Sequence, residues 1–539
     1  MKKVSFMLES EFLKSYNYSH YRCCISILLL FLSFSLSSQS EWVRIDSDNK
    51  LFYKTTEQGD KIMDFSHAGY MGGGIPLPNV PVKKVVGQAN GVSDYSDIIQ
   101  DAIHCVSNLP LIDGVRGAVL LLPGNYPCNK SLIIECDGVV LRGSGKYYKE
   151  SKIVMQGPKH TAIVLSNDNT RGIGNRLGVA DESAKLYKIT DKYIPAGALS
   201  FKVKDASGLS IGDNIEIRKL VTEKWLQFMQ MDDLVRDGKP QTWIKAGSSI
   251  ITERTIASID KNKITLTVPL ADSYNSIFTE NSTTLIVRNG IKRVTNSGIE
   301  NLQIISPYQS VNHTEALYYA MNINGEDCWA RDIDCFETME SVRIGGRRIT
   351  LERVNVVRKA LHIGASKPAE FAPNGGQVLV RDCSVEGDNI WFVAVGAGQT
   401  GPIVFLDCNF KGNGRIEGHQ RWSSGMLFDN CVLPDGGIDF KNRGSMGSGH
   451  GWGTAWSVAW NCEAKNYVNQ LPPGTCNWVI GCTGDRLQLP RPFDKEGKLP
   501  EGIFDSHGQH VAPKSLYLAQ LQERLNRTTG VDNKSADRL

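Results

Sequence analysis

The chain has 539 residues, with 60 Lys and Arg against 57 Asp and Glu, and a formal net charge of +3. Without a concentrated basic run, this balance gives no electrostatic footprint for nucleic acid. A hydrophobic content of 41% is enough for a core and excludes global disorder. Length alone allows three or four domains, although large β domains break that rule.

The N-terminal segment predicts export. Residues 1–22 are polar with a surplus of Lys and Arg, the apolar run Ile25–Leu36 follows, and small residues end the segment near Ser40. This order is typical of a signal peptide over residues 1–40, and the run is short for a bilayer span. A single membrane anchor is the alternative. We expect a mature protein that is secreted, periplasmic or at the cell surface, with no transmembrane segment after signal removal.

Residues 41–110 are predicted to form an N-terminal cap segment. Short strands interrupted by Gly and Pro lead to Asp97–Val106, where apolar residues recur at helical spacing after an acidic start. Patterns of buried strands follow at Val119–Leu122 and Val139–Leu141, each bounded by Gly or Pro.

The same stretch resembles a known family. Ile99–Ile103, Gly117–Tyr126 and Gly138–Gly145 together resemble the opening of the pectate-lyase superfamily, over about 50 residues. The resemblance implies a capping helix followed by the first coils of a right-handed parallel β-helix. It does not choose a substrate, because tailspikes, lyases and hydrolases share this opening. Some members use calcium, so the resemblance allows Ca²⁺ as a cofactor, although no acidic cluster in the chain requires it.

A change in the sequence pattern marks residues 186–290 as an insertion. Alternating strands over Phe201–Lys204 and Gly212–Ile217, a more polar excursion and a strand over Ile264–Val268 follow one another. We expect a small β insertion that decorates the main body and is not an independent catalytic domain.

The C-terminal half repeats a short pattern of apolar, polar and inward positions, which predicts the architecture. The inward position falls at residues 302, 333, 354, 383, 408, 431, 462 and 482, in steps of 20 to 31 residues. Such variable steps exclude a strict short-period solenoid and fit the coils of a large β-helix, whose stacking builds the core. The predicted fold is all-β: a single-stranded right-handed parallel β-helix over residues 111–510, followed by a C-terminal helix and tail over residues 511–539.

Five cysteines share the inward position of the repeat. They are Cys383, Cys408, Cys431, Cys462 and Cys482. On successive coils they would stack about 4.8 Å apart, where thiols behave as small hydrophobic groups. A linear stack lacks the tetrahedral convergence that zinc needs, and in-register side chains are poorly oriented for disulfides.

For the other cysteines, the sequence leaves disulfide pairing open. Removal of Cys23 and Cys24 with the signal peptide leaves an odd number, so complete pairing within one chain is excluded. Cys328 with Cys335, or Cys128 with Cys136, could still form a disulfide.

Two successive coils carry charged residues at equivalent positions, and we expect a glycan site there. Stacking of Ile416 on Ile438 would turn the polar residues of both strands outward on one face. These residues are Arg415, Glu417, His419 and Arg421 on one coil, and Asp439, Lys441 and Arg443 on the next. Residues at a similar phase, or in the following Gly-rich loop, are His362, Trp391, Trp422, His450 and Trp452.

This mixed patch favours cleavage of an acidic polysaccharide by β-elimination. The reaction needs a cation on the uronate carboxylate and a base near the C5 proton. Because Arg binds carboxylates bidentately, Arg421 and Arg443 are the predicted neutralisers. His419 is the predicted base, with Lys441 or His450 as second choice. The predicted substrate-binding residues are His362, Trp391, Arg415, Glu417, Trp422, Asp439 and Trp452.

Two other functions stay open at this point. A glycoside hydrolase needs two carboxyl groups about 5–5.5 Å or about 6.5–9.5 Å apart, and Glu417 with Asp439, or Asp332 with Asp334, are candidate pairs. A non-catalytic glycan binder needs aromatic platforms but not the cations. In each case the expected partner is an acidic polysaccharide, the protein is expected to be a monomer, and no metal ligand is assigned.

Tryptophans are concentrated near this patch. Six of the ten fall between residues 391 and 478, and sugar rings stack on aromatic faces. Trp422 and Trp452 are the predicted platforms, whereas Trp460 and Trp478 lie within copies of the repeat and are expected in the core.

Overall fold

The computed structural model describes residues 38–145, 150–167, 177–178, 185–279, 284–287, 292–309, 317–361, 367–493 and 497–529. The predicted signal peptide lies outside these residues, apart from its last three positions. Within the described part of the chain, no helix has the length and apolar character needed to cross a bilayer.

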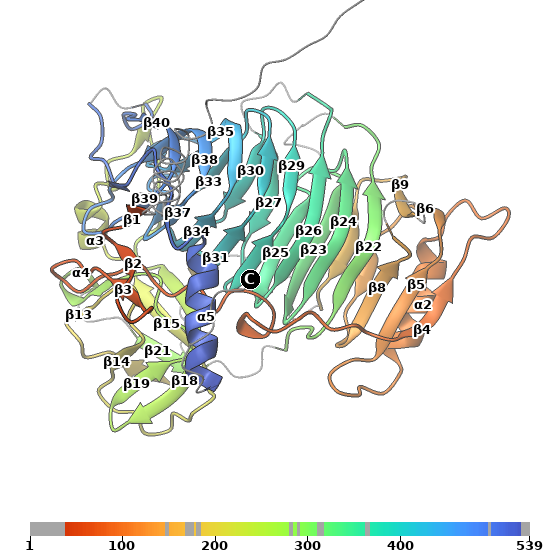
Figure 1. The fold of residues 1–539 in the computed structure, drawn as a ribbon, viewed down its shortest axis with the longest axis horizontal. Coiled ribbons are helices and arrows are strands. Elements are labelled where there is room, and N and C mark those ends of the chain that lie inside the picture. The colour runs from red at the N-terminus through yellow and green to blue at the C-terminus, as the bar shows by residue number, and fades with distance from the viewer. Residues whose placement is uncertain are drawn as a thin grey trace, which may run out of the picture. The chain divides into compact units, whose positions relative to one another are not determined.

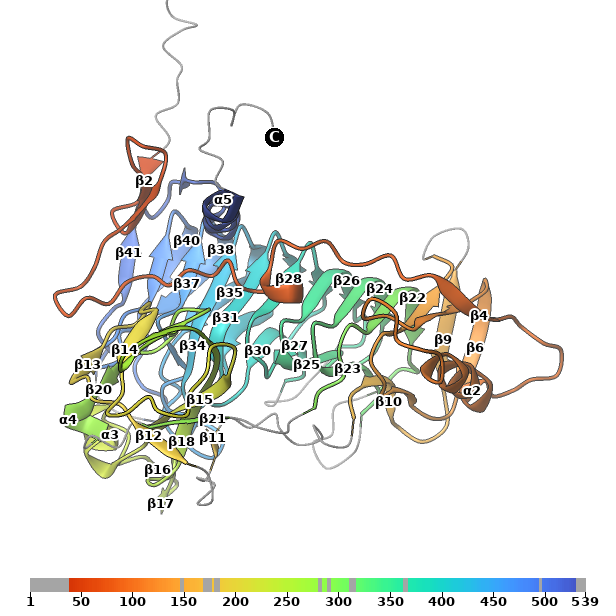
Figure 2. The same ribbon diagram turned by 90° about the horizontal axis from the view of Figure 1, so that it is seen from below.

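Parallel strands stack coil upon coil into a β-helix with three faces, which we name A, B and C (Figures 1 and 2). Face A contains β4 (Val82–Val86), β5 (Gly117–Leu121), β8 (Val139–Gly143), β22 (Gly298–Ile305), β24 (Trp329–Phe336), β26 (Thr350–Val357), β28 (Val378–Arg381), β31 (Thr400–Leu406), β34 (Ser423–Asp429), β37 (Val458–Trp460), β39 (Trp478–Ile480) and β41 (Ile503–Asp505). The predicted fold class, a right-handed parallel β-helix, is confirmed.

Faces B and C complete each coil. Face B contains β6 (Gly124–Cys128), β9 (Ser151–Met155), the second halves of β22, β24 and β26, then β29 (Ser384–Glu386), β32 (Asn409–Lys411) and the first parts of β35 (Val432–Phe440), β38 (Glu463–Asn469) and β40 (Thr483–Leu487). Face C contains β7 (Leu132–Ile134), β10 (Thr161–Leu165), β23 (Tyr319–Glu326), β25 (Val342–Arg347), β27 (Ala369–Pro373), β30 (Trp391–Val395), β33 (Arg415–Gly418) and the last parts of β35, β38 and β40.

The sequence repeat marks the corner between faces A and B. The residue before each inward position has a positive φ, and these residues are Asn301, Asp332, Arg353, Asp382, Asp407, Asn430, Asn461 and Gly481. Seven of these eight are Asn, Asp or Gly, the types that enter the left-handed region at least cost. A single such residue bends the chain, and the following side chain then points into the core.

The cysteine stack is confirmed as part of that core. Its five thiols are at most 1% exposed, and none of the described cysteines forms a disulfide, including the pairs that the sequence left open. Burial raises the pKa of the thiols in the middle of the stack well above the ordinary value, as at Cys408, Cys431 and Cys462. These thiols therefore stay protonated and pack as small apolar groups.

Both predicted helices are present. α2 (Ser96–Ser107) covers the first coils with Ile99, Ala102, Ile103 and Val106. α5 (Leu516–Thr529) lies along the flank of the β-helix, where its first turn bonds to Asp429 of β34. Figure 1 shows it crossing face A next to the N-terminal segment.

The insertion forms its own antiparallel sheet. Its main strands are β12 (Leu186–Lys188), β14 (Ser200–Lys202), β15 (Asn214–Leu220), β18 (Ser249–Asp260), β19 (Lys263–Leu266) and β21 (Thr284–Val287), with the short helix α3 (Glu223–Phe228). It leaves the β-helix after β10 but lies beside coils much later in the sequence (Figure 2), where Arg254 donates to Gly401 O at 2.8 Å. Residues far apart in sequence thus meet near β33 and β34.

Candidate functional site

The predicted stacking of the two charged coils is confirmed. On face C, Ile416 pairs with Ile438 and Glu417 pairs with Asp439. The polar side chains that flank these core residues therefore share one face. We name the group Lys367, Arg415, Glu417, His419, Arg421, Asp439, Lys441, Arg443 and His450 the face-C cluster.

The two carboxylates of this cluster are not a substrate-binding surface, which corrects the sequence prediction. Glu417 and Asp439 are each 1% exposed. Long cationic side chains cover both carboxylates. Arg443 Nη1 lies 3.0 Å from Glu417, Lys441 Nζ lies 2.6 Å from Asp439, and Arg415 also pairs with Asp439. The carboxylates hold cations in place beneath a partly exposed layer.

Glu417 also orients His419. Its Oε1 lies 2.6 Å from His419 Nδ1, and Arg443 Nη1 lies 2.8 Å from Nδ1 and 3.2 Å from Nε2. Since an ionised carboxylate only accepts hydrogen bonds, we assign the imidazole proton to Nδ1. Nε2 then carries the lone pair. The His419 side chain is 20% exposed, so part of its ring lies at the surface of the cluster.

The electrostatic environment fixes the charge of the neighbouring groups. Burial would raise the pKa of Glu417, but Arg443 and Lys441 outweigh it and lower that pKa to about 2. Burial lowers the pKa of His450 to about 3, and Arg443, His419 and Arg421 act in the same direction. Burial opposes ionisation of Lys441, yet Asp439 and Glu417 raise its pKa. At neutral pH the site holds ionised carboxylates, a charged Lys441 and a neutral His450.

Arg421 differs from Arg415, Lys441 and Arg443, each of which pairs with a carboxylate. Among the described residues it has no carboxylate partner, and its Nη2 donates to Ser448 Oγ at 2.6 Å. Its φ is 51° and that of Trp422 is 64°, so two consecutive non-glycine residues occupy the left-handed region. Strain of this kind gathers at functional sites. The turn separates the two side chains and leaves a cation without a protein counter-charge.

The predicted aromatic platforms need correction. Trp422 is 1% exposed and Trp452 is 2% exposed. The insertion covers both: Trp243 meets the Trp422 ring at 5.7 Å, and Trp452 Nε1 donates to Met229 O. They therefore join the insertion to the coils and offer no open face to a sugar.

Three further residues of the predicted site are Trp391, His450 and His362. Trp391 is partly exposed and packs edge-on against His419, with ring centroids 4.6 Å apart. The His450 ring centre lies 5.0 Å from that of His419, so it also belongs to the site. His362 lies outside the described residues.

Two residues of the site were missed by the sequence analysis. Asn466 accepts a hydrogen bond from Arg415 Nη1 at 2.6 Å and is in register with Gly437. Extending the stacking of outward residues by one more coil would therefore have identified Asn466. Lys367 precedes β27 and interacts electrostatically with Glu417; burial lowers its pKa, and Arg415 and Lys441 act in the same direction. Because Lys367 lies just outside a strand, the alternation of residues within strands could not identify it.

The two carboxylate pairs considered for a hydrolase do not fit that role. A general acid needs a raised pKa, whereas cations lower the pKa of both Glu417 and Asp439 despite their burial. Asp332 occupies the corner between faces A and B and binds Arg353, and Asp334 accepts from Asn355 at 2.8 Å. In both arrangements, cationic or amide side chains already contact the carboxylates.

Metal binding stays a prediction. In the described ranges, no group of three or more His, Cys, Asp or Glu side chains gathers as metal ligands would. The cations that surround Glu417 and Asp439 already satisfy the two carboxylates of the cluster.

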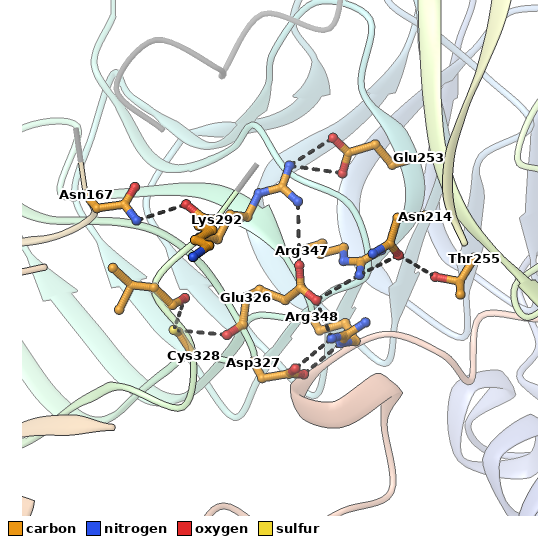
Figure 3. Close-up of polar contacts among 12 residues, drawn as sticks. Asn167, Asn214, Glu253, Thr255, Lys292, Glu326, Asp327, Cys328, Arg347 and Arg348 are labelled. Carbon is orange, nitrogen blue, oxygen red and sulfur yellow. Dashed lines mark hydrogen bonds and ion pairs between the residues drawn. The ribbon is translucent and has the colours of Figure 1, made fainter. Parts of the chain in front are cut away.

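A second charged group, the junction cluster, lies where the insertion meets face C (Figure 3). It consists of Glu253, Arg293, Glu326, Asp327, Arg347 and Arg348. Arg293 joins Glu253 at 2.9 Å to Glu326 at 3.6 Å, and Arg348 joins Glu326 to Asp327 at 2.6 and 2.7 Å. Four residues of this cluster, Glu253, Arg293, Glu326 and Arg347, line a cavity of about 40 Å³ together with Arg254. This cluster clamps the insertion and has no histidine.

Comparison of the sequence with protein-family models and with curated proteins gives no match. Among solved structures, the chain is similar to tailspike protein gp49 of Pseudomonas phage LKA1, at 11% identity and a TM-score of 0.38, over 72% of this chain and 56% of that one. It is similar to the polygalacturonase of Erwinia carotovora ssp. carotovora, at 10% identity and a TM-score of 0.35, over 80% and 98%. It is also similar to the A-module of mannuronan C-5 epimerase AlgE4 of Azotobacter vinelandii, at 10% and 0.27, over 75% and 96%.

The chain thus spans a little over half of the first of these structures, at 56% of its length. Such values give no basis for transferring an activity. The fold seen here is the one that the resemblance to the pectate-lyase superfamily implies.

Proposed function

We propose that the protein acts on a glycan and, more narrowly, that it cleaves a uronic-acid-containing polysaccharide by β-elimination at the face-C cluster. The observation that carries the proposal is the pairing of Glu417 with His419 Nδ1 at 2.6 Å beside Arg421, a cation without a carboxylate partner among the described residues. A partly exposed imidazole oriented by a carboxylate, and a guanidinium without an acid partner among the described residues, supply the two kinds of group that the reaction needs.

The charge balance of the cluster supports an acidic substrate. Its five cationic side chains, Lys367, Arg415, Arg421, Lys441 and Arg443, face two carboxylates, Glu417 and Asp439. The surplus is positive, and the carboxylates are buried where they cannot repel a polyanion. A bound uronate would therefore offset part of this surplus of three positive charges.

The proposed reaction assigns each group one role. Arg421 binds the uronate carboxylate bidentately, which acidifies the C5 proton and stabilises the enolate that forms. His419 Nε2 takes that proton. The electron pair of the C5–H bond forms the C4–C5 double bond, the C4–O bond breaks, and the leaving oxygen takes a proton from water. Glu417 stabilises the imidazolium through Nδ1, and His419 then releases its proton to solvent.

The lyase activity is tested by incubating the protein with a panel of uronic-acid glycans and recording the ultraviolet absorbance of the unsaturated product. Appearance of that absorbance is the expected result. Reducing ends without unsaturated product would replace the lyase by a hydrolase, and glycan binding without either signal would leave a binding protein.

The residue assignment is tested by two substitutions. We expect His419→Ala and Arg421→Ala each to lower turnover by about 10²–10⁴-fold while the far-ultraviolet circular dichroism spectrum stays unchanged. Near-normal activity in both variants would contradict the proposed site.

A further inference from the structure

One outward row of face C contains small side chains next to the cluster. Arg343 is in register with Ala372. Phe371 is in register with Val393, so Ala372 and Ala394 follow each other on successive coils. Ala394 is in register with Glu417. Two methyl groups, one partly exposed at Ala372 and one buried at Ala394, therefore separate Arg343 from Glu417 along this row.

The next outward row is also small and polar. Ile344 pairs with Pro373, and Val395 pairs with Gly418, so the outward residues that follow are Gly345, Asn374, Gly396 and His419. The Asn374 amide lies over Gly396, since a Cβ at Gly396 would lie 2.0 Å from Asn374 Oδ1. Ala372, Asn374 and Gly396 are all partly exposed. A polymer can approach the backbone of face C along this strip and meet an amide suited to sugar hydroxyls.

Arg343 stands at the far end of the strip. Its guanidinium lies 4.0 Å from the centre of the Tyr319 ring, and it pairs with Glu340 through Nη2. The Arg343 side chain is 42% exposed. Arg carries five N–H donors in a planar fork, so donors remain for a carboxylate.

We propose that Arg343 binds a second carboxylate of the substrate, three coils away from the one that reacts. Coils stack about 4.8 Å apart, so the two sites are about 14 Å apart along the β-helix. A pyranose in an extended chain has a length close to one coil, so the glycan would cross Ala394 and Ala372 before it reaches Arg343. This inference rests on the proposed function and narrows its substrate to a polymer in which uronates recur, extending towards the lower-numbered coils.

The experiment compares Arg343→Ala with a matched control on oligouronates of increasing length. Arg381 on face A is the control, because its side chain is 43% exposed and is also paired with a neighbouring acid, Asp382. We expect Arg343→Ala to lower kcat/KM about tenfold on long oligomers and to leave the shortest cleavable oligomer unaffected. Arg381→Ala should leave kcat/KM unchanged at every length.

A second variant tests the strip itself. Ala372→Trp places a bulky ring on the path without removing any charge, and it should reproduce the loss on long oligomers only. Thermal unfolding of each variant checks that the fold persists. Equal activity of Arg343→Ala and Arg381→Ala at all lengths would overturn the inference even if the lyase activity is established.

The proposed lyase reaction and the proposed role of Arg343 can be contradicted independently of each other. If the wild-type protein cleaves no uronic-acid glycan, the proposed reaction is wrong, and titration calorimetry with long oligouronates then decides the inference. An affinity about tenfold weaker in Arg343→Ala than in Arg381→Ala would support the binding strip, and equal affinities would overturn it.

Discussion

The face-C cluster and the junction cluster contain the same residue types in different proportions. In the junction cluster three arginines face three carboxylates (Figure 3). Arg347 of β25 pairs with Glu326 of β23, Arg293 pairs with Glu253 of β18, and Arg348 pairs with Asp327 just after β23. In the face-C cluster five cations face two carboxylates, and two histidines lie beside them. The charges named in the junction cluster balance one another, whereas the face-C cluster has three more cations than carboxylates.

We interpret this difference as separating a structural ion network from the proposed binding site. Buried ion pairs have a high desolvation cost, and evolution retains them where they fix a geometry. The junction arginines neutralise Glu326 so well that its pKa falls despite burial. The face-C carboxylates are neutralised as well, yet within the described ranges Arg421 has no acidic partner. Charge surplus at a partly exposed patch thus points to function more directly than the number of charged residues does.

The largest effect should come from Glu417→Gln. The substitution keeps the shape but removes the charge that holds the proton on His419 Nδ1 and stabilises the imidazolium. We expect kcat to fall by about 10³-fold with KM nearly unchanged, because Glu417 positions the base and does not touch the substrate. Glu253→Gln in the junction cluster should leave both constants unchanged. Equal kinetic effects of the two substitutions would remove the distinction between the clusters.

The next-largest effect should be a loss of stability without a loss of activity. Arg293→Met leaves Glu253 without its 2.9 Å partner in a largely buried position, and it should lower the free energy of unfolding by about 3 kcal/mol. Activity per folded molecule should stay unchanged. Chemical denaturation and turnover, measured on the same samples, check this.

Arg421→Met is the converse case. With no ion pair to lose, the free energy of unfolding should change by about 0.5 kcal/mol or less, while kcat/KM falls about 100-fold. A large loss of stability in Arg421→Met would show that Arg421 has a structural role, and the surplus of charge would then lose its functional meaning.

Much of the fold could be predicted from the sequence because it depends on local rules. Asn, Asp or Gly before each inward residue encodes the corner, and the cysteine stack follows from the same phase. The pairing of Ile416 with Ile438 also followed, since alternation within a strand and stacking between coils are both regular.

The rest depends on tertiary contacts that the sequence does not show. Trp422 and Trp452 are buried because the insertion, nearly 200 residues earlier in the chain, returns to cover them. Trp460 and Trp478 are in the core as expected, but on the outer side of face A, where Trp42 packs against Trp478 with ring centroids 5.6 Å apart. Likewise, the outward phase of Glu417 was right, while its burial depends on how Arg443 and Lys441 fold over it.

The smallest effect should come from His450, the second-choice base, and it tests whether every histidine of the face-C cluster is functional. With its pKa near 3, His450 stays neutral across the working range, so His450→Gln should change kcat only a few-fold and leave the shape of the pH–rate profile unaltered. Its effect on stability has a defined sign. The folded pKa lies below the ordinary value of 6.5, so falling pH protonates the unfolded chain first, and stability is lost progressively between pH 6.5 and about 3.

His450→Gln removes that term, so the variant should lose less stability than the wild type over this interval, as measured by denaturant unfolding at a series of pH values. The two readouts are independent, because one follows catalysis and the other follows the folded state. Loss of one limb of the pH–rate profile would make His450 the titrating group of the reaction and His419 its support. An intact profile with a flatter stability curve would leave His419 as the base and place His450, like the junction cluster, among the groups that shape the site without taking part in the chemistry.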